Sequence, residues 1–270
     1  MTVFVVIGLV VLAVAIGIFF LVGKAQKENL ILAQEQGSSS HSLRLQVEGF
    51  VQSCMEEKLI EALDVVSTQG GLLRYDSKKA LLLDDRFVGY GFIDGQVSLD
   101  EEEFEKNIAF YVDLLLPECT AGFVTFEKIG VTVTEKEVDS YSREFLEEYN
   151  LTEEDFVSVS SVTIKDDEVD LQVEYPLQVQ KGDEKVEIDS FSISLASPLG
   201  RGIAQSRDFL EHFKVTGKVD LANLAGYDGY ARVISAGTEV FILSFYFADD
   251  TVPSSLLVAF ESSEVEGETS

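Results

Sequence analysis

The first 36 residues combine a long apolar run with a polar continuation that favours helix. From Thr2 to Gly23 no side chain carries a charge, and the first charged residue of the chain is Lys24. In a helix these 22 residues would span about 33 Å, close to the roughly 30 Å hydrocarbon core of a bilayer. The continuation to Gln36 contains neither Gly nor Pro. We therefore expect one helix over residues 1–36.

Two surroundings would suit this apolar helix, and the pattern leaves both open. The helix can anchor the chain in a membrane, or it can pack in a filament core, as the N-terminal helices of type IV pilin-like subunits do. A cleaved signal peptide fits less well, because no Lys or Arg precedes the run and the run exceeds a usual apolar h-region. The glutamate that mature bacterial pilins usually carry near their start is absent. In either surrounding, we expect the contacts to be made by Val3, Phe4, Ile7, Val10, Val11, Val14, Ile18 and Leu21.

A helical section is expected over residues 37–121. It begins with a short flexible break, Gly37-Ser38-Ser39-Ser40. Apolar residues then recur at three- and four-residue steps from residue 42 to residue 69, which is typical of a helix with one buried face. Gly70-Gly71 would end this helix with a left-handed C-cap.

A further helix is expected to start at Ser98. Glu101 stands three residues later, which fits a capping box, and three more acids fall in the first turn, where the helix dipole favours them. Between the two helices, residues 75–96 mix Gly with aromatic residues and suggest a loose hairpin or a covering loop. The buried stripe of the second helix is expected to contain Phe104, Ile108, Tyr111, Val112 and Leu115.

After about residue 122 the pattern changes to the alternation of apolar and polar residues that half-buried antiparallel strands show. We expect a β-rich section over residues 122–262, with hairpin tips at Lys165-Asp166-Asp167 and Lys181-Gly182-Asp183. A helix near 199–213 and a short helical piece near 219–224 interrupt the strands. The last strands are expected near 230–235, 239–247 and 256–261, followed by a polar tail over 263–270.

These elements predict an α+β fold. A long N-terminal apolar helix precedes a helical section and a mostly antiparallel β-sheet head domain. No internal repeat is visible.

Charge narrows the range of partners. The chain has 270 residues, with 20 Lys and Arg against 48 Asp and Glu, so its net charge is −28. A field of this sign repels phosphate, which counts against nucleic acid and against an anionic lipid surface as partners. The 46% of hydrophobic residues counts against a disordered acidic tail. The acidic excess suits a surface exposed to high salt or low pH.

Three features favour a location of the head domain outside the cell. Cys54 and Cys119 lie on the two expected helices and could form a disulfide if these pack antiparallel; two separate buried thiols are the alternative. Asn150 begins an Asn-Leu-Thr sequon and is a glycosylation candidate. The acidic exterior is the third feature. Lys24 and Lys27 argue for the opposite orientation, because positive residues flanking a span tend to stay in the cytoplasm.

Catalytic and metal-binding patterns are missing from the sequence. Acidic pairs occur at Asp84-Asp85, Asp166-Asp167 and Asp249-Asp250, but they lack the spaced oxygen ligands of a calcium loop and are interpreted as solvated turns. The sequence has only two Cys and two His, which nearly excludes a Cys/His zinc site. Gly89-Tyr90-Gly91 is too short for a phosphate loop. We therefore expect no enzymatic activity, no cofactor and no metal.

The stretch from Val47 to Cys54, followed by Glu61-Ala62-Leu63 and Gln69-Gly70-Gly71, resembles a known group of proteins. These are uncharacterised archaeal membrane-anchored surface proteins with an N-terminal apolar helix and a helix that contains E-S-C and ends in Q-G-G. A second Cys after another helix and a strand ending in Tyr175-Pro176-Leu177 also match. The resemblance implies location and architecture only.

The expected function is that of a structural cell-surface protein, the subunit of a pilus-like filament assembled through the apolar helix. Its expected partners are copies of itself and, at least before assembly, the membrane, but not nucleic acid. The alternative is a monomeric membrane-anchored ectodomain for ligand binding or cell–cell contact. A membrane-tethered hydrolase is the third hypothesis and would need convergent carboxylates in a pocket.

Overall fold

The computed structural model describes residues 40–83, 86–120, 123–136, 159–220, 224–227, 230–247 and 252–261, with only the backbone at positions 40, 119 and 120. The chain divides into one unit over Met1–Leu45 and a second over Gln46–Ser270. The apolar helix expected over 1–36 and the sequon at Asn150 lie outside the described residues. Of the helices that are described, none has the length and apolar character needed to cross a membrane.

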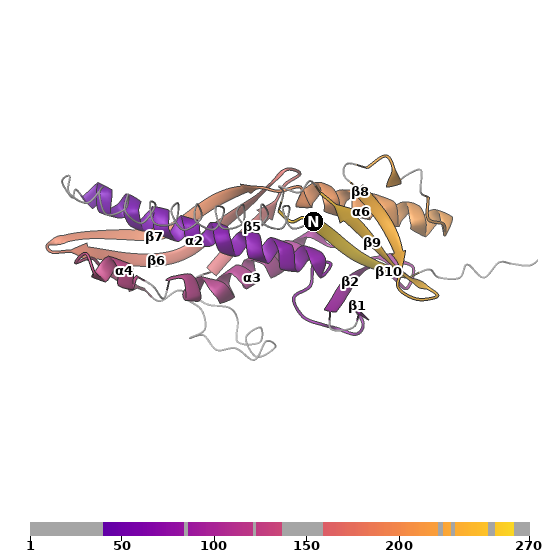
Figure 1. The fold of residues 1–270 in the computed structure, drawn as a ribbon, viewed down its shortest axis with the longest axis horizontal. Helices are drawn as coiled ribbons and strands as arrows, with labels where there is room; N and C mark the ends of the chain where they lie inside the picture. Colours follow the sequence, from indigo (N-terminus) through magenta and orange to yellow (C-terminus); the bar gives the residue numbers. More distant parts are fainter. Residues whose placement is uncertain are drawn as a thin grey trace, which may run out of the picture. The chain divides into compact units, whose positions relative to one another are not determined.

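The first of two sheets joins strands from both ends of the second unit (Figure 1). Its described strands are β1 (Ala80–Leu83), β2 (Arg86–Ile93), β3 (Gln96–Val97), β8 (Tyr230–Ser235), β9 (Val240–Tyr246) and β10 (Ser255–Glu261). Their order is β1-β2-β10-β9-β8, with β3 beside β2. Only β2 and β10 pair in parallel among these strands; the other pairs are antiparallel.

One helix packs on this first sheet through aromatic residues. Helix α6 (Leu199–Thr216) ends at Gly217, whose φ of 64° is the left-handed value expected of a C-cap glycine. The Phe213 ring lies 5.5 Å from the ring of Phe92 in β2 and 5.1 Å from that of Phe260 in β10, both edge-to-face. This cluster holds the parallel β2–β10 pair under the helix.

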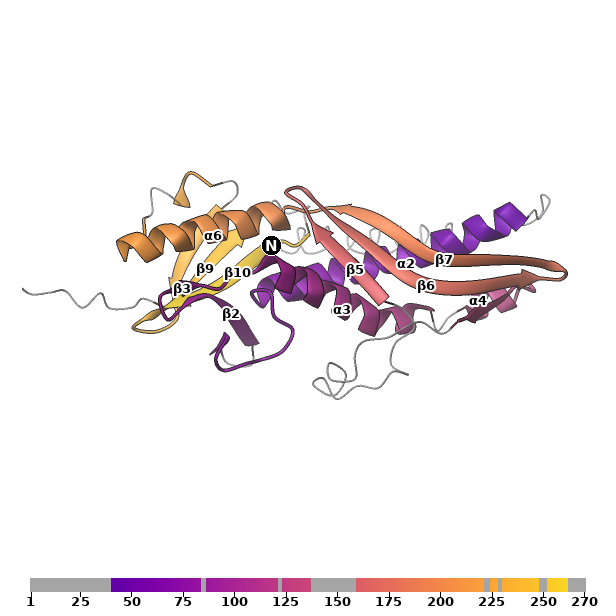
Figure 2. The ribbon, with the colours of Figure 1, turned by 180° about the vertical axis from the view of Figure 1, so that it is seen from behind.

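The second sheet is built around one long strand (Figure 2). Its described strands are β4 (Thr132–Glu135), β5 (Val159–Ile164), β6 (Glu168–Lys181) and β7 (Glu184–Ala196), all antiparallel. β7 follows one edge of β6, whereas β5 and β4 share the other edge, one after the other. Pro176 lies between those two, where the register with β7 also shifts, so its missing N–H interrupts no regular ladder.

Helix α2 (Ser40–Thr68) has the buried stripe that the sequence predicts. From the start of the second unit onward, its fully buried positions include Val47, Val51, Met55, Leu59, Ala62 and Val66. The helix ends as expected, because Gly70 and Gly71 have φ values of 66° and 92° and the Gly71 N–H donates to Val66. The Phe50 ring of α2 packs 5.4 Å from that of Phe126 in α4 (Val124–Glu127).

Helix α3 (Glu101–Thr120) begins later than predicted, and its cap differs. The Ser98 hydroxyl donates to the Tyr90 carbonyl instead of capping the helix. The carboxylate of Asp100 accepts the N–H of Glu102 at 3.2 Å, so Asp100 is the capping residue. The capping box predicted at Ser98 is therefore wrong, because the Ser98 hydroxyl is hydrogen-bonded to the backbone of β2 instead.

Two polar contacts connect α3 to its neighbours. The Tyr111 hydroxyl donates to Glu61 of α2 at 3.1 Å. Burial, together with this bond, raises the pKa of Tyr111 to about 12, so the hydroxyl keeps its proton at neutral pH. On another side of α3, the Asp113 and Glu105 carboxylates accept backbone N–H groups of β5. The side chains of Asp113 and Glu105 thus attach α3 to the outer edge of β5.

The segment expected as a loose hairpin or covering loop forms β1, β2 and β3 and belongs to the first sheet. Gly89 permits this, since its N–H donates to Gln69 at 2.9 Å and a Cβ there would lie 2.7 Å from the Gly70 carbonyl oxygen. Asp94 and Gly95, with φ values of 52° and 73°, form the tight turn between β2 and β3. The observed class is α+β with mostly antiparallel sheets, as predicted.

Candidate functional site

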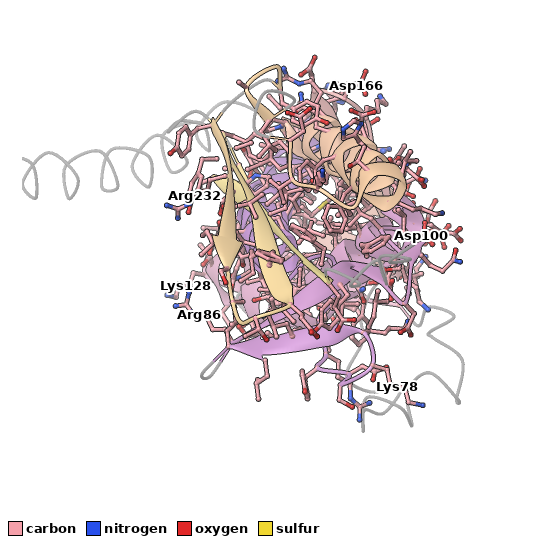
Figure 3. All side chains as sticks on the ribbon, turned by 90° about the vertical axis from the view of Figure 1, so that its right-hand side faces the viewer. Lys78, Arg86, Asp100, Lys128, Asp166 and Arg232 are labelled. Carbon is pink, nitrogen blue, oxygen red and sulfur yellow. The ribbon has the colours of Figure 1, made fainter. Side chains whose placement is uncertain are left out.

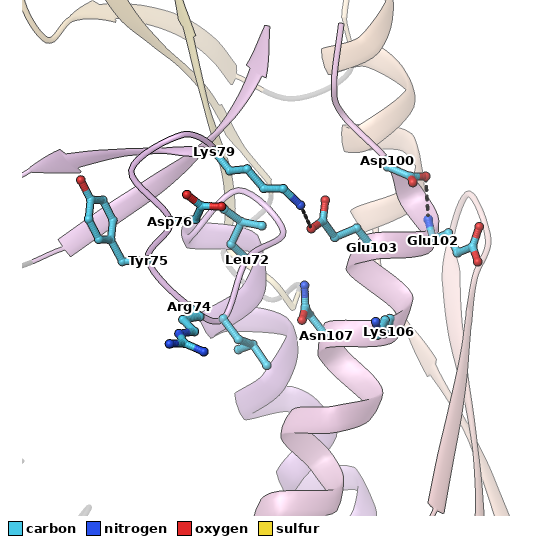
Figure 4. Close-up of a pocket in the computed structure, with 11 residues that line it drawn as sticks. Leu72, Arg74, Tyr75, Asp76, Lys79, Asp100, Glu102, Glu103, Lys106 and Asn107 are labelled. Carbon is cyan, nitrogen blue, oxygen red and sulfur yellow. Dashed lines mark hydrogen bonds and ion pairs between the residues drawn. The ribbon is translucent and has the colours of Figure 1, made fainter. Parts of the chain in front are cut away.

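A cavity of about 820 Å³ opens between the loop that follows α2 and the first two turns of α3 (Figure 4). It is lined by Leu72, Leu73, Arg74, Tyr75, Asp76, Lys79, Asp100, Glu102, Glu103, Lys106 and Asn107. A second cavity, of about 210 Å³, shares Leu72, Lys79, Asp100 and Glu103 with the first. We take this pair of cavities as the candidate site.

Local turns and one buried amide shape the loop side of the cavity. The Asp76 carboxylate accepts the N–H of Lys78 at 2.9 Å, and the Asp76 carbonyl accepts the N–H groups of Lys79 and Ala80. The side-chain amide of Asn107 is buried and donates to the Gly71 carbonyl at 2.7 Å. This bond ties the start of the loop to α3, so the two walls of the cavity are held together.

The charges of the lining are nearly balanced, unlike those of the whole chain. Arg74, Lys79 and Lys106 supply three cations against four carboxylates, whereas the chain has 20 basic and 48 acidic residues. Lys79 and Glu103 form an ion pair across the cavity, with 3.3 Å between nitrogen and oxygen. The Asp100 carboxylate is engaged as the cap of α3. The site therefore presents both donors and acceptors without a strong field of either sign.

An aromatic ring stands at the border of the cavity. Tyr75 is 43% exposed, and its ring centre lies 6.0 Å from that of Phe87 in β2. The exposed ring offers an apolar face to a ligand, and the carboxylates and basic groups of the lining can form directed hydrogen bonds. This combination suits a neutral ligand rich in hydroxyl groups better than a phosphate or a free metal ion. Among the described side chains, no group of three or more His, Cys, Asp and Glu could hold a metal ion.

The structure describes the side chain of only one of the two cysteines in the predicted disulfide. Cys54 lies buried on α2 and is disulfide-bonded. The only other cysteine of the sequence is Cys119, near the end of α3, whose side chain lies outside the described ones. The pairing of Cys54 with Cys119 stays a prediction.

The acidic pair that can be described occupies a turn. Lys165-Asp166-Asp167 connects β5 to β6, and Asp167 pairs with Arg201 of α6 at 2.7 Å. Asp166 points outward, as do Lys78 and Asp100 (Figure 3). Asp84-Asp85 and Asp249-Asp250 lie outside the described residues. The described pair thus serves the turn and an ion pair, in agreement with its interpretation as a solvated turn.

The cavity was not among the sites predicted from the sequence. Its lining comes from two segments, residues 72–79 and 100–107, that no motif connects. One local signal was present, because Arg74, Lys78 and Lys79 place three basic residues within six positions of a strongly acidic chain. That signal marks the loop but does not reveal the opposing wall.

Comparisons with protein families, with curated proteins and with solved structures find no match to this chain.

Proposed function

We propose that the protein is a structural cell-surface protein, the subunit of a pilus-like extracellular filament assembled through its N-terminal apolar segment. The observation that carries this proposal is the uncharged run from Thr2 to Gly23 in front of an acidic α+β domain. Such a run needs apolar neighbours, which the same segments of other copies can provide. Val3, Phe4, Ile7, Val10, Val11, Val14, Ile18 and Leu21 would form the contacts.

The location outside the cell is supported by the disulfide at Cys54. Disulfides persist in oxidising compartments and are rare in the cytosol. A net charge of −28 supports the same location, since like-charged heads stay solvated and apart from one another. The apolar N-terminal segments would then hold the subunits of the filament together.

Charge placed in the apolar run should prevent assembly. We expect the full chain to form fibres of uniform width when detergent is removed, and the double variant Val10→Lys with Val14→Lys to remain unassembled, because two buried ammonium groups cannot be desolvated cheaply. Electron microscopy and sedimentation of the two proteins make the comparison.

The matched control is Val10→Leu with Val14→Leu, which keeps the apolar character and should still assemble. Recovery of the unaltered chain only as a monomer in the membrane fraction would refute the filament. That result would instead favour the second candidate function.

The second candidate is a monomeric membrane-anchored ectodomain that binds a ligand, and the cavity at Tyr75 and Lys79 favours it. The nearly neutral lining, the exposed ring and the mixture of donors and acceptors suit a neutral saccharide. Saccharide hydroxyls both donate and accept, so carboxylates and cations on opposite walls can each be used.

Binding of neutral oligosaccharides to the full chain in detergent should depend on the cavity wall. We expect Tyr75→Ala and Arg74→Ala each to weaken binding by roughly tenfold, since each removes part of the ligand's contact surface. A glycan array followed by titration calorimetry measures this. Lys128→Ala, an exposed basic residue of the second unit outside the lining, should bind as the unaltered chain does. Equal loss in the control, or no binding at all, would remove this candidate.

A further inference from the structure

The smaller of the two cavities in the candidate site is a side chamber of the larger one. It has a volume of about 210 Å³ and shares Leu72, Lys79, Asp100 and Glu103 with the larger cavity. A water molecule takes up about 30 Å³ in the liquid, so a small organic group fits into this space. Because the two cavities have these residues in common, a substituent of a ligand in the larger cavity can reach into the smaller one.

Apolar side chains form much of the smaller cavity. Its lining includes Leu72, Ile93, Leu99 and Phe104. Ile93 is half-buried and the other three are buried. An apolar group that displaces water from such a surface gains the free energy of burial. The smaller cavity therefore suits a group that carries a methyl.

The charged residues in the lining of the smaller cavity balance one another. They are Lys78, Lys79, Asp100 and Glu103. Lys79 and Glu103 are paired at 3.3 Å, and Figure 4 shows this pair connecting the loop after α2 with α3. An ammonium has three donors and a carboxylate about four acceptor sites, so both can bind a ligand and keep their own bond. A neutral group with one donor and one acceptor can bind to both partners, whereas an anion would be repelled by the carboxylates and a cation by the lysines.

We propose that the smaller cavity binds the acetamido group of an N-acetylated saccharide. The N–H of that group can donate to Glu103, its carbonyl can accept from Lys79, and its methyl can contact Leu99 and Phe104. The sugar ring would stay in the larger cavity, where Tyr75 offers its exposed face. This inference rests on the ligand-binding candidate function proposed above and names the class of saccharide. It does not depend on filament assembly.

The methyl group distinguishes this ligand from an unsubstituted sugar. A hydroxyl at the same carbon could also bind Lys79 and Glu103, but it would leave the apolar lining in contact with water. One small apolar group more or less in a pocket typically changes binding by tenfold or more, roughly. The cavity should therefore select the N-acetylated sugar over its unsubstituted counterpart.

Two neutral oligosaccharides that differ in this group test the inference. We expect the full chain in detergent to bind a tetramer of N-acetylglucosamine about tenfold tighter, or more, than a tetramer of glucose with the same linkage. Titration calorimetry measures both affinities. Neither ligand is charged, so the net charge of −28 cannot produce the preference.

Ile93→Phe should remove the preference, because the larger side chain fills part of the smaller cavity. We expect this variant to bind the N-acetylated tetramer about tenfold more weakly and the glucose tetramer within about twofold of the unaltered chain. The matched control is Ile234→Phe in β8, the same change at a residue that is 38% exposed and lies outside the lining of both cavities. It should keep the full preference.

Nuclear magnetic resonance locates the acetyl group without a variant. Intermolecular nuclear Overhauser effects should connect the acetyl methyl protons with protons of Leu99 and Phe104. Equal affinity for the two tetramers, a preference that persists in Ile93→Phe, or an acetyl methyl that contacts neither residue would overturn the inference and leave binding of neutral saccharides standing. Failure of both tetramers to bind would overturn the inference together with the ligand-binding candidate function.

Discussion

Replacing Cys54 and Cys119 together by alanine should lower the free energy of unfolding by about 4 kcal/mol. The expected pair closes a loop from residue 54 to residue 119, and a cross-link over that separation of 65 residues (119 − 54) removes much of the unfolded chain's freedom. Cys54 is buried on α2, so the substitution also loses a small amount of packing. Urea unfolding of both proteins measures the difference.

Two controls accompany this comparison. Ser53→Ala changes an exposed neighbour on the same helix and should shift the free energy of unfolding by less than about 0.5 kcal/mol. Non-reducing mass spectrometry of proteolytic fragments should find the peptides of Cys54 and Cys119 linked. Unlinked peptides, or a double variant as stable as the unaltered chain, would contradict the prediction.

Asp113→Ala should cost about 3 kcal/mol of stability, the second large effect. Asp113 is fully buried, and its two oxygens accept the N–H of Ser160 at 2.9 Å and the hydroxyl of Ser160 at 2.7 Å. Alanine would leave the half-buried N–H of Ser160 without its acceptor, and an N–H left unpaired costs more than the bond itself contributes. The midpoint of urea unfolding should fall while its slope stays unchanged.

Conservative variants separate the carboxylate's role from simple packing. Asp113→Asn keeps the volume and one acceptor oxygen, so it should cost about half as much as alanine. Glu118→Ala, an exposed carboxylate on the same helix, should change stability by less than about 0.5 kcal/mol. If Asp113→Ala behaved like Glu118→Ala, the capping of β5 would not be energetically important.

The geometry explains why two carboxylates on α3 serve β5 so well. Glu105 and Asp113 are eight residues apart, which is about 12 Å along a helix. Their acceptor sites match Ile164 and Ser160, four residues apart or about 13 Å along a strand running the other way. This match covers the outer side of β5 in the second sheet.

Much of the architecture could be predicted from local pattern. The buried face of α2, its glycine stop, the hairpin turns at residues 165–167 and 182–183, and the strands near 230–235, 239–247 and 256–261 all agree with the structure. These features depend on residues close together in sequence, where periodicity and turn preference act directly. Of the two alternatives for residues 75–96, the hairpin is confirmed by the antiparallel β1–β2 and β2–β3 pairs. The larger sheet could not be predicted in this way, since β2 joins it through its parallel pairing with β10 far along the chain.

The candidate site shows where local pattern stops being informative. Arg74 and Lys79 come from a loop and Glu103 and Lys106 from a helix, and no spacing rule connects them. The same holds for Ser98. Its position in the sequence suited a helix cap, but in the structure its hydroxyl donates to the Tyr90 carbonyl of β2 at 2.6 Å. Hydrogen-bonding groups take whichever partner the fold brings near, and that partner is a property of three-dimensional distance.

By itself, the sequence determined that the run from Thr2 to Gly23 carries no charge and that the net charge of the chain is strongly negative, and its periodicities predicted an α+β fold with mostly antiparallel strands. Those properties are sums and periodicities, which do not depend on how distant segments meet. Only the tertiary structure decided which carboxylates cap β5, which residues line the cavity and which strands pair in each sheet. Each of these depends on a distance between residues remote in sequence, and the packing of the whole domain sets that distance.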